Sequence, residues 1–197
     1  MPARELRVID EFLGSAHVFA STVGSVVEAR LLRELAGDQV TVSQFKLLKL
    51  VAITDRQTIG DVALFLGVSN AAASKAVDKL VRRNLLRREE GERDRRVIHL
   101  SLTAASRRLL AVYDEEKRHK LQRIFGKFSD DDLRRTAEML DRLSAGIVEQ
   151  DGAEELCLQC GIYFRERCLV RQIAKRNCFY KRHQNGNGHR QHNGNGH

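Results

Sequence analysis

The sequence lacks any hydrophobic run near the ~18 residues that a membrane-spanning helix requires, and no charged and then apolar leader opens it. We therefore expect a cytoplasmic protein that makes no contact with a membrane. The sequence also lacks a nucleotide-binding glycine loop, a paired nucleophile and base, and a constellation of carboxylates. These absences argue against an enzyme.

Cysteine is absent before Cys157, and all four cysteines fall between Cys157 and Cys178. In a reducing compartment such a cluster is not a disulfide framework and points to another use of the thiols. Acidic residues are in the minority, since 34 lysines and arginines face 26 aspartates and glutamates. The resulting net charge of +8 favours a polyanionic partner. At 197 residues, the chain suffices for one compact domain and an appendage.

Two short helices separated by a tight turn are predicted after Thr58. Thr58 is a suitable N-cap for the first helix and Gly67 a suitable stop, while Ser69 is a suitable N-cap for the second. In both helices the apolar residues recur at the spacing of one buried face. These residues are Ile59, Val62, Ala63 and Leu66 in the first helix, and Ala73, Ala76, Val77 and Leu80 in the second.

The opposite face of the second helix is short, polar and basic, which suits the floor of a DNA major groove. Two strands are predicted next, Leu85–Glu90 and Val97–Leu102, joined by a charged tip at residues 91–96. A helix-turn-helix followed by such a hairpin is a winged helix, which most often binds DNA.

Long helices are predicted on both sides of the winged helix, so the expected fold class is mainly α. Glu5 to Leu35 reads as one helix whose broad apolar stripe favours a dimer interface over purely internal burial. A second helix extends from Val40 to Ile53 and is capped by Thr41 or Ser43.

After the hairpin, a long helix is predicted to begin at Thr103 and to break near Gly126. Ser129 is followed by three aspartates, which is typical of a helix start because acidic groups are favourable at the positive end of the helix dipole. This last helix continues to about Gln150.

The order of elements and the wing motif resemble the multiple-antibiotic-resistance regulator (MarR) family. The motif is Asp94-x-Arg96, three residues, and then Leu100-Ser101-Leu102-Thr103. The resemblance covers roughly residues 5–150 and implies a homodimeric winged-helix transcription regulator, usually a repressor, whose first and last helices form the dimer. It also implies recognition helices in successive major grooves of a pseudo-palindromic operator, with wings in the flanking minor grooves.

Matching this pattern position by position yields the candidate DNA-binding residues. Asp94 and Arg96 match the wing pair, in which the arginine enters a minor groove and the aspartate orients a neighbouring arginine. Arg93 and Arg95 are candidates for the same role. The recognition helix contributes the side chains nearest to bases and phosphates. These are Ser69, Asn70, Ala71, Ser74, Lys75 and Lys79.

The chain departs from the family by continuing into a segment with Cys157, Cys160, Cys168 and Cys178. Four thiolates complete either a tetrahedral zinc site or an iron–sulfur cluster of the four-iron or two-iron type. Cys157-x-x-Cys160 followed by glycine is common in zinc sites, but the second such pair of a zinc ribbon is missing. We expect an iron–sulfur cluster, with zinc as the alternative and free or redox-paired thiols as a third reading.

The sequence therefore predicts a homodimeric DNA-binding regulator whose cysteine cluster senses redox state or iron. The alternative is a regulator with a structural zinc site that responds to a small organic ligand. A third hypothesis is an electron-transfer or cluster-handling protein whose winged helix only docks partners, but the basic recognition helix and the arginine-rich wing argue against it.

We divide the chain into five parts on this basis. Residues 1–36 form a dimerisation helix, residues 37–103 the winged helix-turn-helix, and residues 104–152 the C-terminal dimerisation helices. Residues 153–182 form a cysteine-rich metal-binding extension. Residues 183–197 are a tail of asparagine, glycine and histidine with no apolar residue to bury, which we expect to be disordered.

Overall fold

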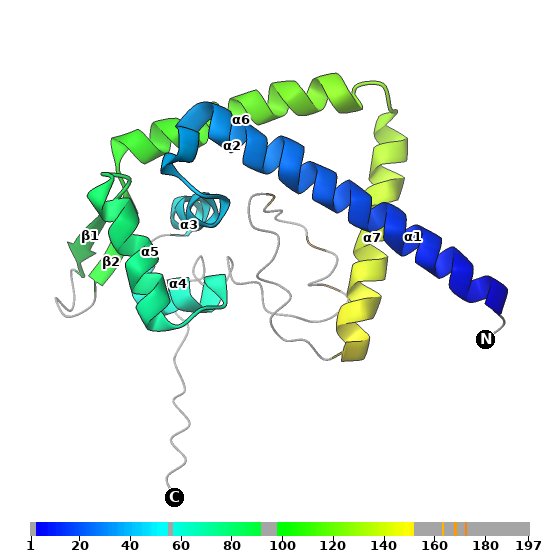
Figure 1. Ribbon diagram of the computed structural model, residues 1–197, viewed down its shortest axis with the longest axis horizontal. Coiled ribbons are helices and arrows are strands. Elements are labelled where there is room, and N and C mark those ends of the chain that lie inside the picture. The colour runs from blue at the N-terminus through cyan, green and yellow to red at the C-terminus, as the bar shows by residue number, and fades with distance from the viewer. Residues whose placement is uncertain are drawn as a thin grey trace, which may run out of the picture.

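The computed structural model describes residues 3–54, 57–91 and 98–151, together with Tyr163, Cys168 and Gln172. Helices dominate these residues, as the sequence predicts, and one antiparallel pair of strands lies at one end (Figure 1). None of the described helices is long and apolar enough to cross a membrane. The elements are α1 (Ala3–Thr22), η1 (Val23–Ala29), α2 (Arg30–Ala36), η2 (Gly37–Gln39), α3 (Val42–Ile53), α4 (Ile59–Leu66), α5 (Asn70–Arg82), β1 (Leu86–Glu90), β2 (Ile98–Leu102), α6 (Ala104–Phe125) and α7 (Asp130–Asp151).

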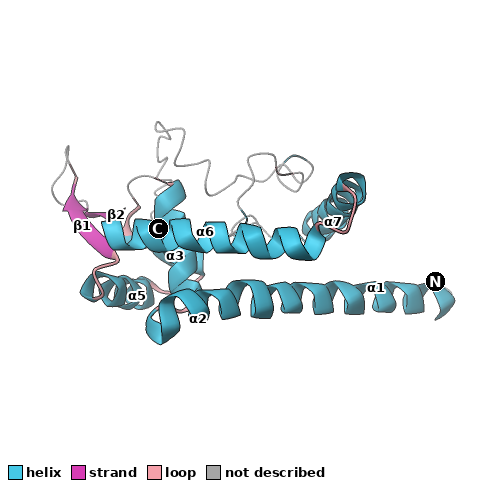
Figure 2. Ribbon diagram, turned by 90° about the horizontal axis from the view of Figure 1, so that it is seen from above, coloured by secondary structure: helices cyan, strands magenta, loops and turns pink. Residues whose placement is uncertain are grey.

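The first helical path, predicted as one helix, contains a π-helical turn, η1, between α1 and α2. It ends at Gly37, whose φ of +56° would strain a residue with a side chain. The sequence does not predict η1, because a contact from a distant helix accompanies it. The Nζ of Lys120, on α6, donates a hydrogen bond to the main-chain oxygen of Val26 at 3.1 Å. Beyond the turn, α2 packs on α6 (Figure 2).

Helix α3 forms the centre of the fold, and Figure 1 shows it end-on between the α2–α6 pair and the α4–α5 pair. Thr41, rather than Ser43, is its N-cap. The Thr41 side chain accepts from the N–H of Gln44 at 3.3 Å, and the Gln44 side chain accepts from the N–H of Thr41 at 3.1 Å. Because helices surround α3, most of its large apolar residues are buried, and several are fully so. They include Phe45, Leu47, Leu48 and Leu50.

The three signals predicted for the helix-turn-helix are all confirmed. Thr58 accepts from the N–H of Asp61, whose carboxylate accepts from the N–H of Thr58 at 2.9 Å. Gly67 ends α4 with a φ of +63°. Ser69 caps α5 by accepting from the N–H of Ala72 at 3.2 Å. These local bonds fix the angle at which α5 leaves the turn.

The inward faces of α4 and α5 also follow the predicted pattern. Val62, Ala63, Ala73, Val77 and Leu80 are buried. Ile59, Leu66 and Ala76 are only half-buried. Phe65, which the pattern did not assign to this face, joins the core.

Asn84 follows α5 with a φ of +53°, unusual for a residue other than glycine. The N–H of Leu85 reaches back to the main-chain oxygen of Leu80 at 2.9 Å, which closes the helix in a Schellman motif. The chain then turns into β1, which begins one residue later than predicted and pairs with β2 so that Leu86 lies opposite Leu102.

Helices α6 and α7 begin at the predicted caps, since Thr103 accepts from the N–H of Ser106 at 3.2 Å and Ser129 accepts from that of Asp132 at 3.1 Å. Between them, α6 ends at Gly126. Figure 2 shows α6 extending across the fold from the hairpin to α7. The fold therefore places the hairpin and α5 at one end and the free length of α1 and α7 at the other.

Candidate nucleic-acid interface

The predicted residues of the recognition helix lie at the start of α5 and along its outer face. Its inner face is fixed in the core, so the outer side chains are presented on a rigid support. Ser74 is half-buried. The exposed members are Ser69, Asn70, Ala71, Lys75 and Lys79.

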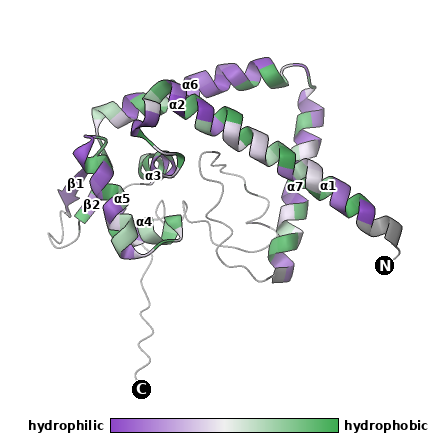
Figure 3. Cartoon of the chain, in the orientation of Figure 1, coloured by the Kyte–Doolittle hydropathy of each residue, from purple (hydrophilic) through white to green (hydrophobic). Residues whose placement is uncertain are grey.

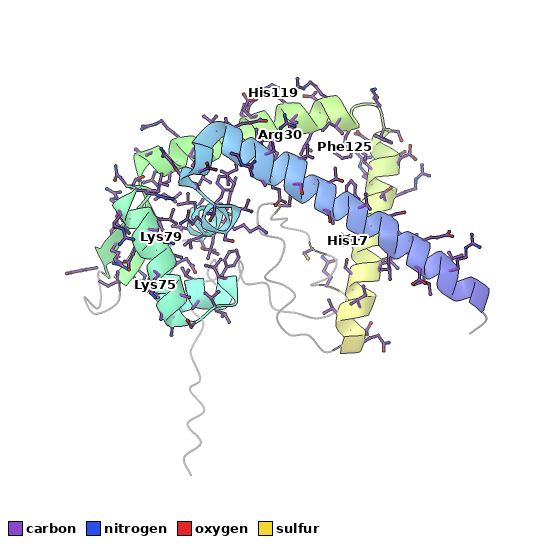
Figure 4. The ribbon with its side chains drawn as sticks, viewed as in Figure 1. His17, Arg30, Lys75, Lys79, His119 and Phe125 are labelled. Atoms are coloured by element: carbon purple, nitrogen blue, oxygen red, sulfur yellow. The ribbon has the colours of Figure 1, made fainter. Side chains whose placement is uncertain are left out.

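The outer face of α5 carries an excess of positive charge. Lys75 and Lys79, labelled in Figure 4, form no ion pair with the described carboxylates. Asp78, the acidic residue between them, pairs instead with Arg88 of β1, at 2.7 Å between Oδ1 and Nη2. This ion pair neutralises the negative charge of Asp78 and connects the hairpin to the recognition helix.

Two arginines follow Lys79 at the end of α5. Arg82 is exposed, whereas Arg83 donates from Nη1 to Oε1 of Gln44 at 3.4 Å and so connects α5 to α3. Arg87 on β1 is also exposed, but it pairs with Glu89, at 3.7 Å between Nη2 and Oε1. Among the described residues, the unpaired positive charge of this region is therefore that of the recognition helix itself.

Residues 92–97, which include most of the predicted hairpin tip at residues 91–96, lie outside the described residues. Arg93, Asp94, Arg95 and Arg96 all belong to this tip. Their roles in a minor groove stay predictions.

Among the four predicted metal ligands, Cys168 belongs to the described residues. It is half-buried and forms no disulfide, and its main-chain oxygen accepts from the N–H of Gln172 at 3.2 Å. Cys157, Cys160 and Cys178 lie outside the described residues. Within the described part of the chain, no group of three or more histidine, cysteine or acidic side chains is arranged to hold a metal ion. The metal site stays a prediction.

A groove of about 1020 Å³ between α3, α6 and α7 is a second candidate site, which the sequence did not predict. Four of its polar lining residues are Lys49, Asp114, Lys117 and Arg118, which we call the polar wall. The apolar lining residues are called the apolar wall. It includes Ile53, Leu110, Leu121, Phe125, Phe128 and Leu133, of which Phe125 is labelled in Figure 4.

The polar wall is held together by Asp114, which lies between two lysines. Its Oδ2 contacts the Nζ of Lys49, and its Oδ1 lies 3.6 Å from the Nζ of Lys117. The lysine side chains are only 11% and 16% exposed. Burial lowers the pKa of Lys117, and the Asp114 carboxylate acts in the opposite direction. Two cations against one carboxylate make this wall attractive to an anionic group.

One signal in the sequence could have indicated this cluster. Lys49 is a single cation within the apolar run of α3 from Leu47 to Val51. A lysine in such a run needs a partner, because an unpaired buried charge is costly. The sequence does not show that the partner is Asp114, which follows 65 residues later.

Comparison with known proteins places the winged helix in a family. Residues 40–98 match the model of the MarR family. The chain is also 22% identical over 112 residues to the uncharacterized HTH-type transcriptional regulator YpoP of Bacillus subtilis (strain 168), over 57% of this chain and 79% of YpoP.

Two solved structures illustrate the likeness in fold. One is Streptococcus pneumoniae FabT in complex with DNA, with a TM-score of 0.59 and 21% identity over 72% of this chain and 96% of FabT. The other is Staphylococcus aureus MarR in complex with salicylate and kanamycin, with a TM-score of 0.61 and 18% identity over 74% of this chain and 96% of that one.

The structural likeness extends well beyond the winged helix, because it covers about three quarters of the chain. It establishes a MarR fold, mainly α, with long helices before and after the winged helix. The match of residues 40–98 to the MarR family agrees with the expectation that the protein is a regulator and not an enzyme. Residues 40–98 are thus similar to the winged helix of the MarR family, and the described chain has the mainly α fold of MarR regulators.

Proposed function

We propose that the protein is a homodimeric repressor that binds a pseudo-palindromic operator, with α5 of each protomer in a major groove and each wing over a flanking minor groove. The observation that carries this proposal is the outer face of α5, where Lys75 and Lys79 are exposed and Asp78 is neutralised by Arg88. Such cations supply phosphate contacts, while Asn70 can hydrogen-bond to base edges. FabT, which is similar in fold, was solved in complex with DNA.

Dimerisation is supported by apolar side chains that the single chain leaves in solvent. Helices α1 and α7 overlap in Figure 1, but Figure 2 shows that they are separated. Figure 3 shows hydrophobic residues along both. The exposed ones include Ile9, Phe12, Leu13 and Phe19 on α1 and Leu133, Leu140, Leu143 and Ile147 on α7. Their three- and four-residue spacing forms a stripe on each helix, and extensive exposed apolar surface is typical of an interface.

Sedimentation velocity tests the dimer. Phe19→Glu places a charge in the α1 stripe at a side chain that is 51% exposed, and it should convert the dimer into monomers. Leu64→Glu is the matched control, because Leu64 is 49% exposed but lies on α4. It should leave the dimer intact. A wild-type protein that sediments as a monomer at micromolar concentration would contradict the proposal.

Operator binding is tested by selecting duplexes from a random pool and measuring affinity for the enriched sequence against salt. Lys79→Ala should weaken binding and reduce the slope of log affinity against log salt by about 0.9, the effect of one lost phosphate contact on B-form DNA. Lys127→Ala, an exposed lysine after α6, should leave the slope unchanged. Failure of the wild-type protein to bind any duplex, even at low salt, would refute the proposal.

We further propose that the input signal is redox state or iron, read by an iron–sulfur cluster on Cys157, Cys160, Cys168 and Cys178. The support is the donor set, because four thiols in one short segment are the soft ligands that such clusters take. The bound cluster would supply redox chemistry, and this chain would supply the thiolates. Anaerobically purified protein should be brown and contain iron and sulfide, whereas Cys160→Ala should remain a folded dimer without iron. Colourless wild-type protein that contains zinc would refute the cluster.

The groove favours one alternative, in which zinc is structural and the signal is a small organic acid. Its polar wall attracts an anion and its apolar wall suits a ring or chain. S. aureus MarR was solved with salicylate. Under this alternative, salicylate should release the wild-type protein from its duplex and should fail to release Lys117→Met, while oxidants have no effect. Release by oxidant and not by salicylate would eliminate it.

A further inference from the structure

The π-helical turn η1 interrupts the first helix where the helix meets α6. Such turns are rare and are frequent at functional sites. Two later parts of the chain contact this one. Lys120 of α6 donates to the main-chain oxygen of Val26, and Glu28 lies close enough to Tyr163 for its carboxylate to contribute to raising the pKa of that hydroxyl. Neither contact belongs to the DNA-binding surface, so operator binding alone does not explain the turn.

Tyr163 lies beyond α7, three positions after Cys160 and five before Cys168. Its ring covers Lys117, whose Nζ is 5.0 Å from the ring centroid. The same Nζ is 5.9 Å from the ring centroid of Tyr113, so the ammonium lies within cation–π distance of two tyrosines. Burial raises the pKa of Tyr163 to about 12, and the charge and hydrogen bond of Glu28 act in the same direction. The hydroxyl is therefore protonated and available as a donor at neutral pH.

The contacts continue inward from Lys117 to the centre of the fold. Tyr113 is fully buried, and its ring centroid lies 4.3 Å from that of Phe45 on α3. Asp114 joins Lys117 to Lys49, which is also on α3. A contiguous set of contacts thus connects Tyr163 with α6, and through α6 with α3 and with η1, where Lys120 bonds to Val26. Packed chains of this kind can carry coupling between distant sites.

We propose that Tyr163 anchors the cysteine-containing segment to η1 and α6, and that this anchor holds the first helix and α6 at the angle required for operator binding. Release of Tyr163 frees Glu28 and Lys117 together, and the first helix then moves relative to α3. The effect on affinity rests on the operator binding proposed above, whereas the docking itself does not.

Hydrogen exchange measured by mass spectrometry tests the docking on the full chain. Tyr163→Ala removes both the ring over Lys117 and the donor to Glu28, and it should raise exchange in the peptide that covers residues 23–29 by about tenfold or more. Tyr163→Phe keeps the ring and should produce a smaller rise. Tyr180→Ala, in the same segment, is the control and should leave this peptide unchanged. Unchanged exchange in Tyr163→Ala, or an equal rise in Tyr180→Ala, would overturn the assignment of Tyr163 as the anchor.

A double-mutant cycle tests the contact with Glu28 directly. Glu28→Gln should raise exchange in residues 23–29 in the wild-type background and should have little further effect in Tyr163→Phe, since the donor is already absent. Fully additive effects would show that the two side chains act independently and would overturn this contact.

The effect on DNA is measured separately, with the selected duplex. Tyr163→Ala should change its affinity by at least about fivefold without changing the salt slope, because no phosphate contact is lost. A rise in exchange without a change in affinity would refute the coupling and retain the docking. If the wild-type protein binds no duplex, operator binding fails, and the exchange experiment still decides the docking.

Discussion

Replacing Asp114 with asparagine should lower the free energy of unfolding by about 2 kcal/mol, because the two lysines that it joins would lose their carboxylate. Lys49 lies on α3 and Lys117 on α6, so the substitution acts at the contact between these two helices. Each ammonium already disfavours the other, since the charge of Lys49 contributes to lowering the pKa of Lys117. Asparagine has nearly the size of aspartate, so packing is kept and only the charge is removed.

The magnitude follows from how far each group is buried. Removal of one partner from a fully buried ion pair costs about 3–5 kcal/mol, whereas an exposed pair contributes less than about 1 kcal/mol. Both lysines are largely buried, but Asp114 is 38% exposed, which places the cost between these limits. Lys49→Met in the Asp114→Asn background removes one of the two uncompensated cations, and it should recover about half of the loss.

Urea unfolding followed by circular dichroism measures these effects, at one fixed protein concentration because the stability of a dimer depends on it. Glu115→Gln is the matched control: Glu115 is the next residue of α6, and its pairs with Arg118 and His119 are exposed. It should leave the urea midpoint almost unchanged, because exposed ion pairs contribute little to stability. The reasoning is refuted if Asp114→Asn costs no more than Glu115→Gln, or if adding Lys49→Met makes it less stable still.

Three further predictions concern local chemistry. Thr58→Ala removes the N-cap of α4 and should cost about 1 kcal/mol in urea unfolding, whereas Ser43→Ala, which caps nothing, should cost almost nothing. Asn84→Ala should cost about 1 kcal/mol because of its left-handed φ, while Asn84→Gly should be close to neutral in the same assay. The pKa of Tyr163 is raised from 10.0 to about 12 by folding, so the protonated hydroxyl stabilises the fold below pH 10 and that contribution disappears as pH rises to 12. Tyr163→Phe should therefore lose less stability between pH 10 and 12, measured by urea midpoints.

Local chemistry explains why the helix boundaries were predictable. An N-cap bonds to an N–H only a few residues ahead, so Thr58, Ser69 and Thr103 could be recognised from their neighbours in the sequence. Glycine at the end of α4 follows from a conformation that favours it. The choice between Thr41 and Ser43 needed the structure, because both residues satisfy the same chemical rule and only the path of the chain distinguishes them.

Contacts between distant segments explain what was missed. The π-helical turn is accompanied by a bond from Lys120, 94 residues away from Val26, and no periodicity within the first helix indicates it. The Lys49–Asp114 contact joins two helices that the sequence separates by the whole winged helix. In each case the sequence contains the residues but not their juxtaposition.

The candidate DNA-binding surface falls between these two cases. The 3.6-residue period predicted which side chains of α5 point outward, and the structure agrees for Asn70, Lys75 and Lys79. The period did not predict which of these outward charges are left without an ion-pair partner. Asp78 would have weakened the basic face, but Arg88 on β1 neutralises it. The neutralisation of Asp78 depends on the fold of the hairpin, because β1 brings Arg88 to α5.

Helix α6 joins the proposed input to the proposed output, and the bonds at its first turn explain how. Thr103 donates from Oγ1 to the main-chain oxygen of Asn84 after α5, and Arg107 donates from Nη2 to that of Leu102 at the end of β2, both at 2.7 Å. Because a helix of 22 residues is a rod of about 33 Å, a tilt imposed near Lys117 moves the recognition helix and the base of the wing together. Paired recognition helices must be spaced by about one DNA turn, roughly 34 Å, so such a tilt reduces affinity for the operator more than for random duplex. Loss of a cation such as Lys79 instead weakens the affinity for the operator and the affinity for random duplex to a similar degree. The ratio of the two affinities therefore distinguishes control through α6 from damage to the binding surface.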